Sequence, residues 1–464
     1  MTALPRLSAE LFTIPVEDAF LVYAPLRQAA FVTNAAVVNE IADLQDVTID
    51  QPENGTSEVI EFLRQLEIVD GGEEIRPITS YGGEPKPTSV TLFLTTACNL
   101  RCTYCYASAG DTPKKSMPMD VARKGIDFVI ANAVELGQSG IGLAYHGGGE
   151  PSVNWKTLTE SLAYAKEQAA VAGLTVHSAM ACNGVLPDYK IDWIIENLNS
   201  VSLSFDGLPE VHDAHRVDTK GQGSSASVIH TIRRFDEAGF DYGVRLTVTL
   251  ENIIHMEASI RYVCENFHPK AIQVEPAYQL GRWRDAPSSE TAGFIAGFRA
   301  AQAAAREHGM EINFSAARVG SLSNHFCGIT QDSFCLTADG NVSACYETFM
   351  EDNEWAKTFF YGTYDSAAAE YRFNLPVLEH LRNQSVEHRD FCKGCFAKWT
   401  CGGDCYHKSL SVNGAGDFQG SDRCHIIREL TKDQILHKVA QSGGLFWHEE
   451  RPEFTKSQGK EIML

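Results

Sequence analysis

Between residues 89 and 276 the sequence alternates six strand-like runs with helical patterns. The strand-like runs are residues 90–95, 141–145, 174–180, 201–205, 243–249 and 271–275. Helical patterns such as residues 120–136 lie between them, with apolar residues recurring on one face. This order predicts an α/β fold, in which helices cover a parallel sheet that closes partly as a (β/α)6 barrel of the TIM type. Ligands of such folds bind at the carboxyl ends of the strands.

The chain is acidic, with 60 Asp and Glu residues against 39 Lys and Arg residues and a net charge of −21. Nucleic acids and anionic membranes attract basic surfaces, so we expect neither as a main partner. Residues 1–10 lack the basic and apolar segments of a signal peptide. No run of about 18 apolar residues predicts a membrane span. We therefore expect a cytoplasmic protein.

Eleven of the 13 cysteines fall into two groups, and only Cys182 and Cys264 stand alone. In a large chain without an export signal, clustered cysteines favour metal binding or redox chemistry over disulfides. The first group, Cys98, Cys102 and Cys105, follows the first predicted barrel strand. Three thiolates can hold three irons of a 4Fe–4S cluster and leave the fourth iron open. A structural zinc site would instead take four ligands.

The motif CxxxCxΦC, with Tyr104 as its aromatic residue, resembles that of the radical S-adenosylmethionine (radical SAM) superfamily. The resemblance implies that the open iron chelates S-adenosylmethionine. One electron then cleaves this cofactor to a 5′-deoxyadenosyl radical, which abstracts a hydrogen atom from the substrate. Further positions that resemble the family's cofactor-binding residues follow the later strands: Gly148, Gly149, Glu150, Asn183, Ser204, Arg216 and Val248. By resemblance, Glu150 supplies a counter-charge to the methionyl amine and Arg216 pairs with the methionyl carboxylate.

The second group resembles the SPASM extension of radical SAM enzymes, which binds two auxiliary 4Fe–4S clusters. By this resemblance the nearer cluster takes Cys327, Cys335, Cys345 and Cys405, and the outer one takes Cys392, Cys395, Cys401 and Cys424. Together with the first group, this gives three clusters. The spacing of Cys335 varies among relatives, and without it the nearer cluster has a free site for substrate. The alternative is a pair of zinc ribbons.

The chain divides into four parts on this interpretation. Residues 1–85 resemble a PqqD-type winged-helix unit, which binds a leader peptide as an added strand. The radical SAM barrel takes residues 86–315, the cysteine-rich SPASM domain residues 316–440, and a tail residues 441–464. The alternative for the first part is a cap that stabilises the barrel.

The leading functional hypothesis is a peptide maturase that forms a thioether or carbon–carbon cross-link in a ribosomally made precursor peptide. Its electron would come from a one-electron reductant such as flavodoxin or ferredoxin. One alternative is a sulfatase-maturing formylglycine oxidase, but Tyr346 and Glu347 follow Cys345 where those relatives place an aspartate base. A peptide epimerase would need a cysteine hydrogen donor, for which only Cys182 is placed. A non-catalytic, metal-dependent binding module for leader peptides is the last alternative.

Overall fold

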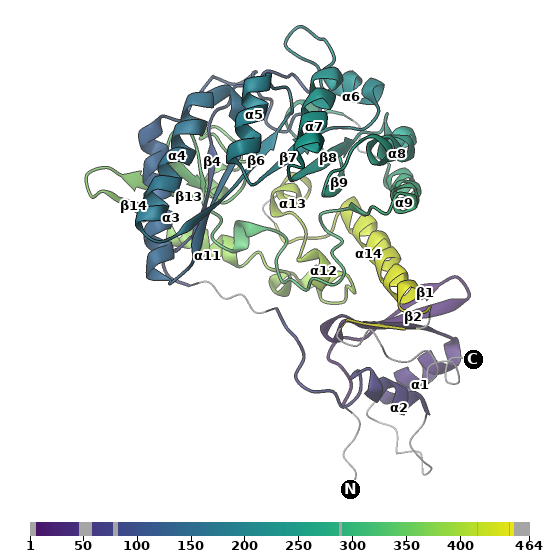
Figure 1. Cartoon of the computed structure of the whole chain (residues 1–464). Coiled ribbons are helices and arrows are strands. Elements are labelled where there is room, and N and C mark those ends of the chain that lie inside the picture. The colour runs from purple at the N-terminus through teal and green to yellow at the C-terminus, as the bar shows by residue number, and fades with distance from the viewer. Residues whose placement is uncertain are drawn as a thin grey trace.

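The residues that the structure describes form two β-sheets, which lie at opposite ends of the molecule in Figure 1. The computed structural model describes residues 6–45, 58–77, 82–286, 290–414, 416–444 and 446–449. One sheet has four strands in the order β1-β2-β3-β15. The other has eleven strands in the order β10-β9-β8-β7-β6-β5-β4-β11-β12-β13-β14. No helix of the described residues is long and apolar enough to cross a membrane.

The centre of the large sheet consists of six parallel strands in sequential order. They are β4 (Ser89–Phe93), β5 (Gly140–His146), β6 (Thr175–Cys182), β7 (Ser200–Ser204), β8 (Tyr242–Val248) and β9 (Ala271–Pro276). The covering helices are α3 (Met119–Glu135), α4 (Trp155–Val171), α5 (Asp188–Asn197), α6 (Pro209–His215), α7 (Ser225–Ala238), α8 (Met256–Asn266) and α9 (Thr291–Glu307). The predicted α/β fold with a partial barrel is confirmed, and each strand is found where the sequence predicts it.

Side chains of each barrel strand alternate between two environments. On β8, Tyr242, Val244, Leu246 and Val248 are at most 2% exposed and belong to the main hydrophobic core. The residues between them, including Arg245, are half-buried or exposed and face the opposite side, the lumen of the barrel. The lumen is therefore the place where polar groups of the strands can meet a ligand.

The cysteine-rich region continues the barrel sheet. β11 (Cys335–Leu336) pairs in parallel with β4, and β12 (Asn341–Ser343), β13 (Phe360–Asp365) and β14 (Glu370–Phe373) follow in antiparallel pairs. On the far side, β10 (Ile312–Asn313) pairs with β9. The helices are α10 (Ala356–Phe359), α11 (Leu375–Arg382), α12 (Lys398–Cys401), α13 (Tyr406–Asn413) and α14 (Asp422–Gln441). The sequence of this cysteine-rich region does not predict these strands, and β11 and β12, with two and three residues, are too short to leave a periodic signal.

The N-terminal sheet begins with three antiparallel strands, β1 (Phe12–Val16), β2 (Ala19–Ala24) and β3 (Ala29–Thr33), followed by α1 (Ala35–Gln45) and α2 (Glu58–Gln65). Asn34 caps α1, since its Oδ1 accepts hydrogen bonds from the backbone N–H groups of Ala36 (2.9 Å) and Val37 (3.2 Å). The sequence indicates β2, β3 and both helices but not β1.

The fourth strand of this sheet, β15 (Phe446–His448), comes from the other end of the chain. It pairs with β3, and Figure 1 shows it as a yellow strand against the purple N-terminal unit. The Phe446 ring lies 6.2 Å from that of Phe62 on α2, and Lys438 of α14 lies 4.7 Å from the Trp447 ring centroid. The sequence predicts only a tail from residue 441, because three residues are too few to reveal a strand whose partner is so distant in the chain.

We expect Phe446→Ala to destabilise the N-terminal unit by about 3–5 kcal/mol, because a buried ring is replaced by a cavity. Hydrogen exchange of the β3 amides should then accelerate, since their partner strand loses its anchor. Tyr189→Ala serves as the control, because Tyr189 on α5 is 62% exposed. Unchanged β3 exchange in Phe446→Ala would contradict this packing.

Candidate functional site

The first cysteine group lies on the loop that follows β4. Burial raises the pKa of Cys98 to about 12 and that of Cys102 to about 11; the charges of Cys102 and Cys105 add to the effect on Cys98, and that of Cys105 adds to the effect on Cys102. These thiols are therefore protonated at neutral pH unless a cation stabilises the thiolates. Metal binding at this loop would release protons. Such a set of three close thiols suits three irons of a 4Fe–4S cluster.

Backbone contacts fix the cysteine loop from two sides. The Thr103 N–H donates to the carbonyl of His215 (2.9 Å), at the end of α6. From the segment after β9, Arg282 donates through Nη1 to the Cys102 carbonyl (3.0 Å) and through its backbone N–H to the Cys105 carbonyl (3.1 Å). Gly281 has φ +54, and a Cβ there would lie 2.2 Å from the Cys105 oxygen. No sequence pattern indicates this role of Arg282, because its partners are backbone atoms of a distant loop.

The three glycines after β5 pack against protein atoms of the site. Gly147 has φ +120, and a Cβ on Gly149 would lie 2.3 Å from the Ala97 carbonyl oxygen, beside Cys98. A Cβ on Gly148 would lie 2.3 Å from the Phe349 ring. These positions therefore require glycine because the cysteine loop and the cysteine-rich region approach closely.

Glu150 connects the turns after β5 and β6. Its buried carboxylate accepts hydrogen bonds from the backbone N–H groups of Ser152 (3.0 Å) and Asn183 (2.8 Å). Burial raises its pKa above the ordinary value. Both oxygens thus have backbone partners in this structure, whereas the sequence predicts a counter-charge to a cofactor amine. The described contacts give Glu150 a positioning role.

Asn183 lies directly beside the first cysteine. Its Nδ2 donates to Asn99 Oδ1 (2.7 Å) and lies 3.7 Å from Cys98 Sγ. The neighbouring Cys182 is buried, and its sulfur accepts a hydrogen bond from the Gly184 N–H (3.2 Å). Burial raises the pKa of Cys182 well above the ordinary value, as for a thiol that packs in a core.

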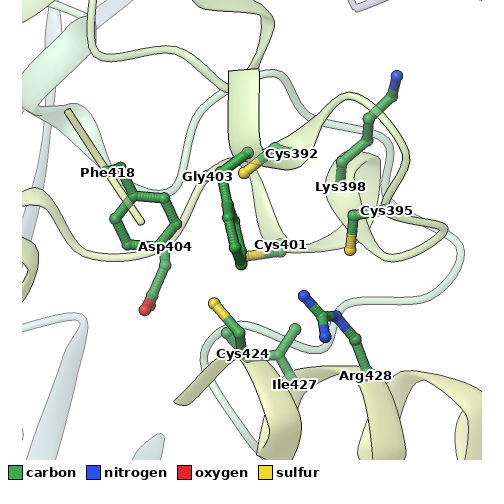
Figure 2. A pocket seen from close by; sticks show the side chains of 11 residues that line it. Cys392, Cys395, Lys398, Cys401, Gly403, Asp404, Phe418, Cys424, Ile427 and Arg428 are labelled. Carbon is green, nitrogen blue, oxygen red and sulfur yellow. The ribbon is translucent and has the colours of Figure 1, made fainter. Parts of the chain in front are cut away.

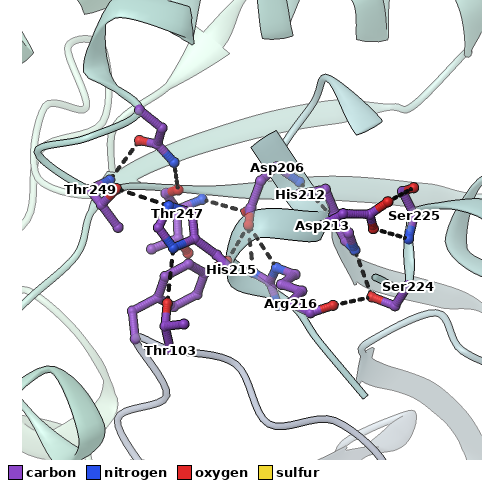
Figure 3. Close-up of polar contacts among 12 residues, drawn as sticks. Thr103, Asp206, His212, Asp213, His215, Arg216, Ser224, Ser225, Thr247 and Thr249 are labelled. Atoms are coloured by element: carbon purple, nitrogen blue, oxygen red, sulfur yellow. Dashed lines mark hydrogen bonds and ion pairs between the residues drawn. The ribbon is translucent and has the colours of Figure 1, made fainter. Parts of the chain in front are cut away.

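Arg216 and Tyr104 surround a buried carboxylate that the sequence did not single out, Asp206 (Figure 3). Arg216 donates from Nε to Asp206 Oδ2 (3.0 Å) and from Nη2 to Oδ1 (3.4 Å). The Tyr104 hydroxyl donates to the same carboxylate, and the guanidinium carbon lies 5.2 Å from the Tyr104 ring centroid. Burial alone would raise the pKa of Asp206, but the charge of Arg216 lowers it. The structure therefore pairs Arg216 with a protein carboxylate, where the sequence predicts a pair with a cofactor carboxylate.

The same carboxylate reaches the neighbouring strand. Asp206 Oδ1 accepts a hydrogen bond from the Thr247 N–H of β8 (3.1 Å). His215 bridges Thr103 (2.9 Å) of the cysteine loop and Thr249 (3.2 Å) after β8, as Figure 3 shows. The cysteine loop, β7, β8 and the end of α6 thus form one polar network.

Ser204 and Val248 differ in their access to the lumen. Ser204 is half-buried on the lumen side of β7, where a ligand can reach it. Val248 is 1% exposed and shares the core face of β8, so its side chain points away from the lumen. The cofactor contact that the sequence predicts at Val248 stays a prediction, and it would have to involve the backbone of β8, because the alternation of the strand puts the side chain under the helices.

The predicted outer cysteine set lines one small cavity. Figure 2 shows Cys392, Cys395, Cys401 and Cys424 around this cavity, with Lys398 and Arg428 beside them. The cysteines come from the segment 390–395, from α12 and from α14. Four thiols facing one cavity are the donor set that a 4Fe–4S cluster takes. Among the described residues no three His, Cys, Asp or Glu side chains converge on a single ion; cluster ligands need not, because each binds a different iron.

The nearer cysteine set lies between the barrel and the cysteine-rich region. Burial raises the pKa of Cys345 well above the ordinary value, and Cys405 and Cys327 add to this effect, so the three thiols lie close together. Cys335 is fully buried on β11, beside the barrel strand β4. Burial raises its pKa, and the charge of Cys327 adds to this effect. The structure thus brings three of the four predicted ligands together and places Cys335 next to Cys327.

Residues 92–263 match the model of the radical SAM superfamily. The barrel is a radical SAM domain. The resemblance inferred from the cysteine motif is therefore confirmed for this part of the chain, which contains the cysteine loop, the three glycines, Asp206 and Arg216.

Known proteins resemble this chain beyond the motif. A cysteine-type anaerobic sulfatase-maturating enzyme of Clostridium perfringens is 24% identical over 170 residues, which cover 36% of this chain and 46% of that enzyme. Two further curated relatives match over 57% and 40% of their own length, so the chain spans about half the length of these relatives.

Two solved structures share the fold of the radical SAM domain and its extension. Native anSMEcpe with bound AdoMet gives a TM-score of 0.61 at 18% identity, covering 76% of this chain and 99% of that chain. Streptococcus suis SuiB bound to the precursor peptide SuiA gives a TM-score of 0.50 at 13% identity, covering 89% of this chain and 99% of that chain.

We expect Asp206→Asn to lower the free energy of unfolding by about 3–5 kcal/mol, because the buried Arg216 guanidinium loses its counter-charge. Denaturant unfolding followed by circular dichroism measures this change. Asp188→Asn is the matched control, since Asp188 pairs with Arg234 and His230 but is 68% exposed, and solvent screens such a pair, so we expect a much smaller loss there. Equal effects of the two substitutions would contradict the structural role of Asp206.

Proposed function

We propose that the protein is a radical SAM peptide maturase, which abstracts a hydrogen atom from a ribosomally made precursor peptide and forms a cross-link. The observation that carries this proposal is the position of Cys98, Cys102 and Cys105 on a loop of a radical SAM domain, at the carboxyl end of its first strand. We infer that these thiolates hold the cluster that binds S-adenosylmethionine.

Held by these three thiolates, a 4Fe–4S cluster with an open iron would supply the electron for reductive cleavage of S-adenosylmethionine. The residues of this chain would position that chemistry. Asn183 and Arg282 hold the cysteine loop, and the Gly147–Gly149 turn lets this loop and the cysteine-rich region pack closely against the end of β5. Ser204 and the polar residues next to it face the lumen in which a cofactor and a substrate would meet.

The eight C-terminal cysteines suit the second half of such a reaction. Joining a thiol sulfur to carbon removes two hydrogen atoms in total, and one of them leaves with 5′-deoxyadenosine. The other hydrogen atom leaves as a proton and an electron, and this electron needs an acceptor. The two proposed auxiliary sites, at Cys345 and Cys401, are in the cysteine-rich region next to the barrel. We propose two auxiliary 4Fe–4S clusters there, held as the sequence predicts, with a flavodoxin or ferredoxin as the external redox partner in the cytoplasm.

We further propose that the N-terminal sheet binds the leader segment of the precursor peptide by strand addition. Its two edges are β1 and β15. Pro15 on β1 has no backbone N–H, so the β1 edge has fewer hydrogen-bond donors with which to bind an added strand. SuiB with its precursor peptide SuiA is a structural neighbour that supports a peptide substrate.

Oxidation of a sulfatase cysteine or serine is the second candidate function, because several curated relatives are anaerobic sulfatase-maturating enzymes. Glu347, two residues after Cys345, is the nearest carboxylate in sequence to the position of the missing aspartate base. Its carboxylate is paired with His407 Nδ1 at 2.7 Å. Mass spectrometry after incubation with a sulfatase-derived peptide separates the candidates, since oxidation to an aldehyde and cross-linking change the peptide mass differently.

We expect Cys98→Ala to abolish formation of 5′-deoxyadenosine and to remove about four iron atoms per chain, because one of three ligands to the first cluster is lost. Chromatography of reactions with anaerobically reconstituted protein and dithionite measures the product. Cys264→Ala is the control, since Cys264 on α8 lies outside both cysteine groups. Persistence of 5′-deoxyadenosine in Cys98→Ala would refute the proposed cofactor site.

We expect Cys401→Ala to remove about four iron atoms per chain as well, but to leave reductive cleavage of S-adenosylmethionine intact. The reason is that Cys401 belongs to the outer cavity and not to the cysteine loop. Iron analysis and the same chromatographic assay measure the two effects. Zinc in place of iron in the wild-type protein would instead favour a non-catalytic binding module.

A further inference from the structure

Arg245 is a cation of the barrel lumen that has no ion-pair partner among the described residues. It lies on β8, between Ser204 of β7 and Gln273 of β9 in the register of the sheet. Its side chain is on the lumen face, opposite Val244 and Leu246, and the residue is exposed. A guanidinium carries five donors that match a carboxylate. The residue thus presents a positive charge to whatever enters the lumen.

Lys408 of α13 is a second cation near the same place. Its Nζ lies 3.4 Å from the ring centroid of Tyr278, just beyond the end of β9, and no carboxylate within the described ranges forms an ion pair with it. The charges of Arg245 and Lys408 both lower the pKa values of Glu275 and Glu347, against the effect of burial. Both cations therefore lie within electrostatic reach of the same two carboxylates.

Those two carboxylates have closer partners of their own. Glu275 accepts from Arg423 Nη1 (3.4 Å), Gln273 Nε2 (3.0 Å) and the Ser315 N–H (2.8 Å). Glu347 pairs with His407 (2.7 Å). Neither hydrogen-bonds directly to Arg245 or Lys408 in the contacts described. Arg245 neighbours Gln273 in the sheet, and Gln273 donates to Glu275. Glu275 binds Arg423, which contacts the same Tyr278 ring as Lys408. These contacts connect two cations that have no direct ion-pair partner among the described residues, and such charges attract an anion.

The site lies next to the proposed reaction centre. Burial lowers the pKa of His146 at the end of β5 to about 4, and the charge of Arg245 adds to this effect. The charges of Cys105, Glu347 and Arg245 also act on the pKa of Tyr106 on the cysteine loop. Arg245 is thus within electrostatic reach of the cysteine loop and of the end of β5.

We propose that Arg245 and Lys408 bind a carboxylate that enters the lumen with the reactants. Two sources have this chemistry: the methionyl carboxylate of S-adenosylmethionine, and an Asp or Glu side chain of the peptide next to the residue that reacts. This inference rests on the proposed function, and it specifies that the lumen of the enzyme selects a negatively charged group.

The first arm of the test measures the cofactor. Isothermal titration of S-adenosylmethionine into anaerobically reconstituted wild-type protein and Arg245→Gln gives the affinity, with decarboxylated S-adenosylmethionine as the matched ligand. If the carboxylate belongs to the cofactor, Arg245→Gln weakens binding of S-adenosylmethionine about tenfold or more and leaves the decarboxylated ligand unaffected. Arg245→Lys should recover part of the affinity.

The second arm measures the peptide. The probes are two fluorescein-labelled pools of heptapeptides, with Glu or Gln fixed at the centre and blocked ends, added with S-adenosylmethionine. If the carboxylate belongs to the peptide, fluorescence anisotropy shows about tenfold tighter binding of the Glu pool by wild-type protein. Arg245→Gln and Lys408→Gln then lose this preference. Lys166→Gln, on the outer surface of α4, keeps it.

The proposal is overturned if both substitutions leave the affinity for S-adenosylmethionine and the Glu preference unchanged while iron content and circular dichroism match the wild type. Failure of the proposed function is a separate outcome, because it requires that the wild-type protein itself makes no 5′-deoxyadenosine. In that case both titrations still report whether the lumen selects a carboxylate.

Discussion

One buried carboxylate, Asp206, connects the parts of the barrel that have to meet at the cysteine loop. It follows β7, binds the Arg216 guanidinium after α6, accepts from the Tyr104 hydroxyl of the cysteine loop and accepts from the Thr247 N–H of β8. A buried charge is costly unless it is paired and hydrogen-bonded. The network satisfies this requirement only when all four segments are in place, so the geometry of the loop depends on the barrel being correctly formed.

A second buried network joins the barrel to the cysteine-rich region. Arg423 of α14 contacts Glu275 of β9 (3.4 Å) and Asp404 (2.7 Å), which precedes Cys405. Burial raises the pKa of Asp404 to about 6. Because the strand β11 also extends the barrel sheet beside β4, the C-terminal cysteines are held to the barrel at both of its edges. Their position relative to the lumen is therefore a property of the fold itself.

Much of this architecture could be predicted from the sequence. The six barrel strands are apolar runs of five to eight residues with strong periodic signals, and the cysteine spacing indicated which thiols would group together. The strands β11 and β15 escaped prediction because two or three residues carry no period and their partners are distant in the chain. The role of Asp206 could not be predicted for another reason: only the folded structure shows that Arg216 and Tyr104 both contact its carboxylate. Arg282 was hidden because it recognises backbone carbonyls, which have no sequence signature.

The pairing of β3 with β15 has a consequence for biosynthesis. The ribosome produces β1, β2 and β3 first, but their sheet is completed only by residues 446–448, which are made more than 400 residues later. At translation rates of about 5–20 residues per second, the nascent N-terminal unit spends tens of seconds with the β3 edge unpaired. An exposed strand edge invites pairing with other chains. Synthesis of residues 446–448 thus determines when the β3 edge of the first unit is protected from pairing with other chains.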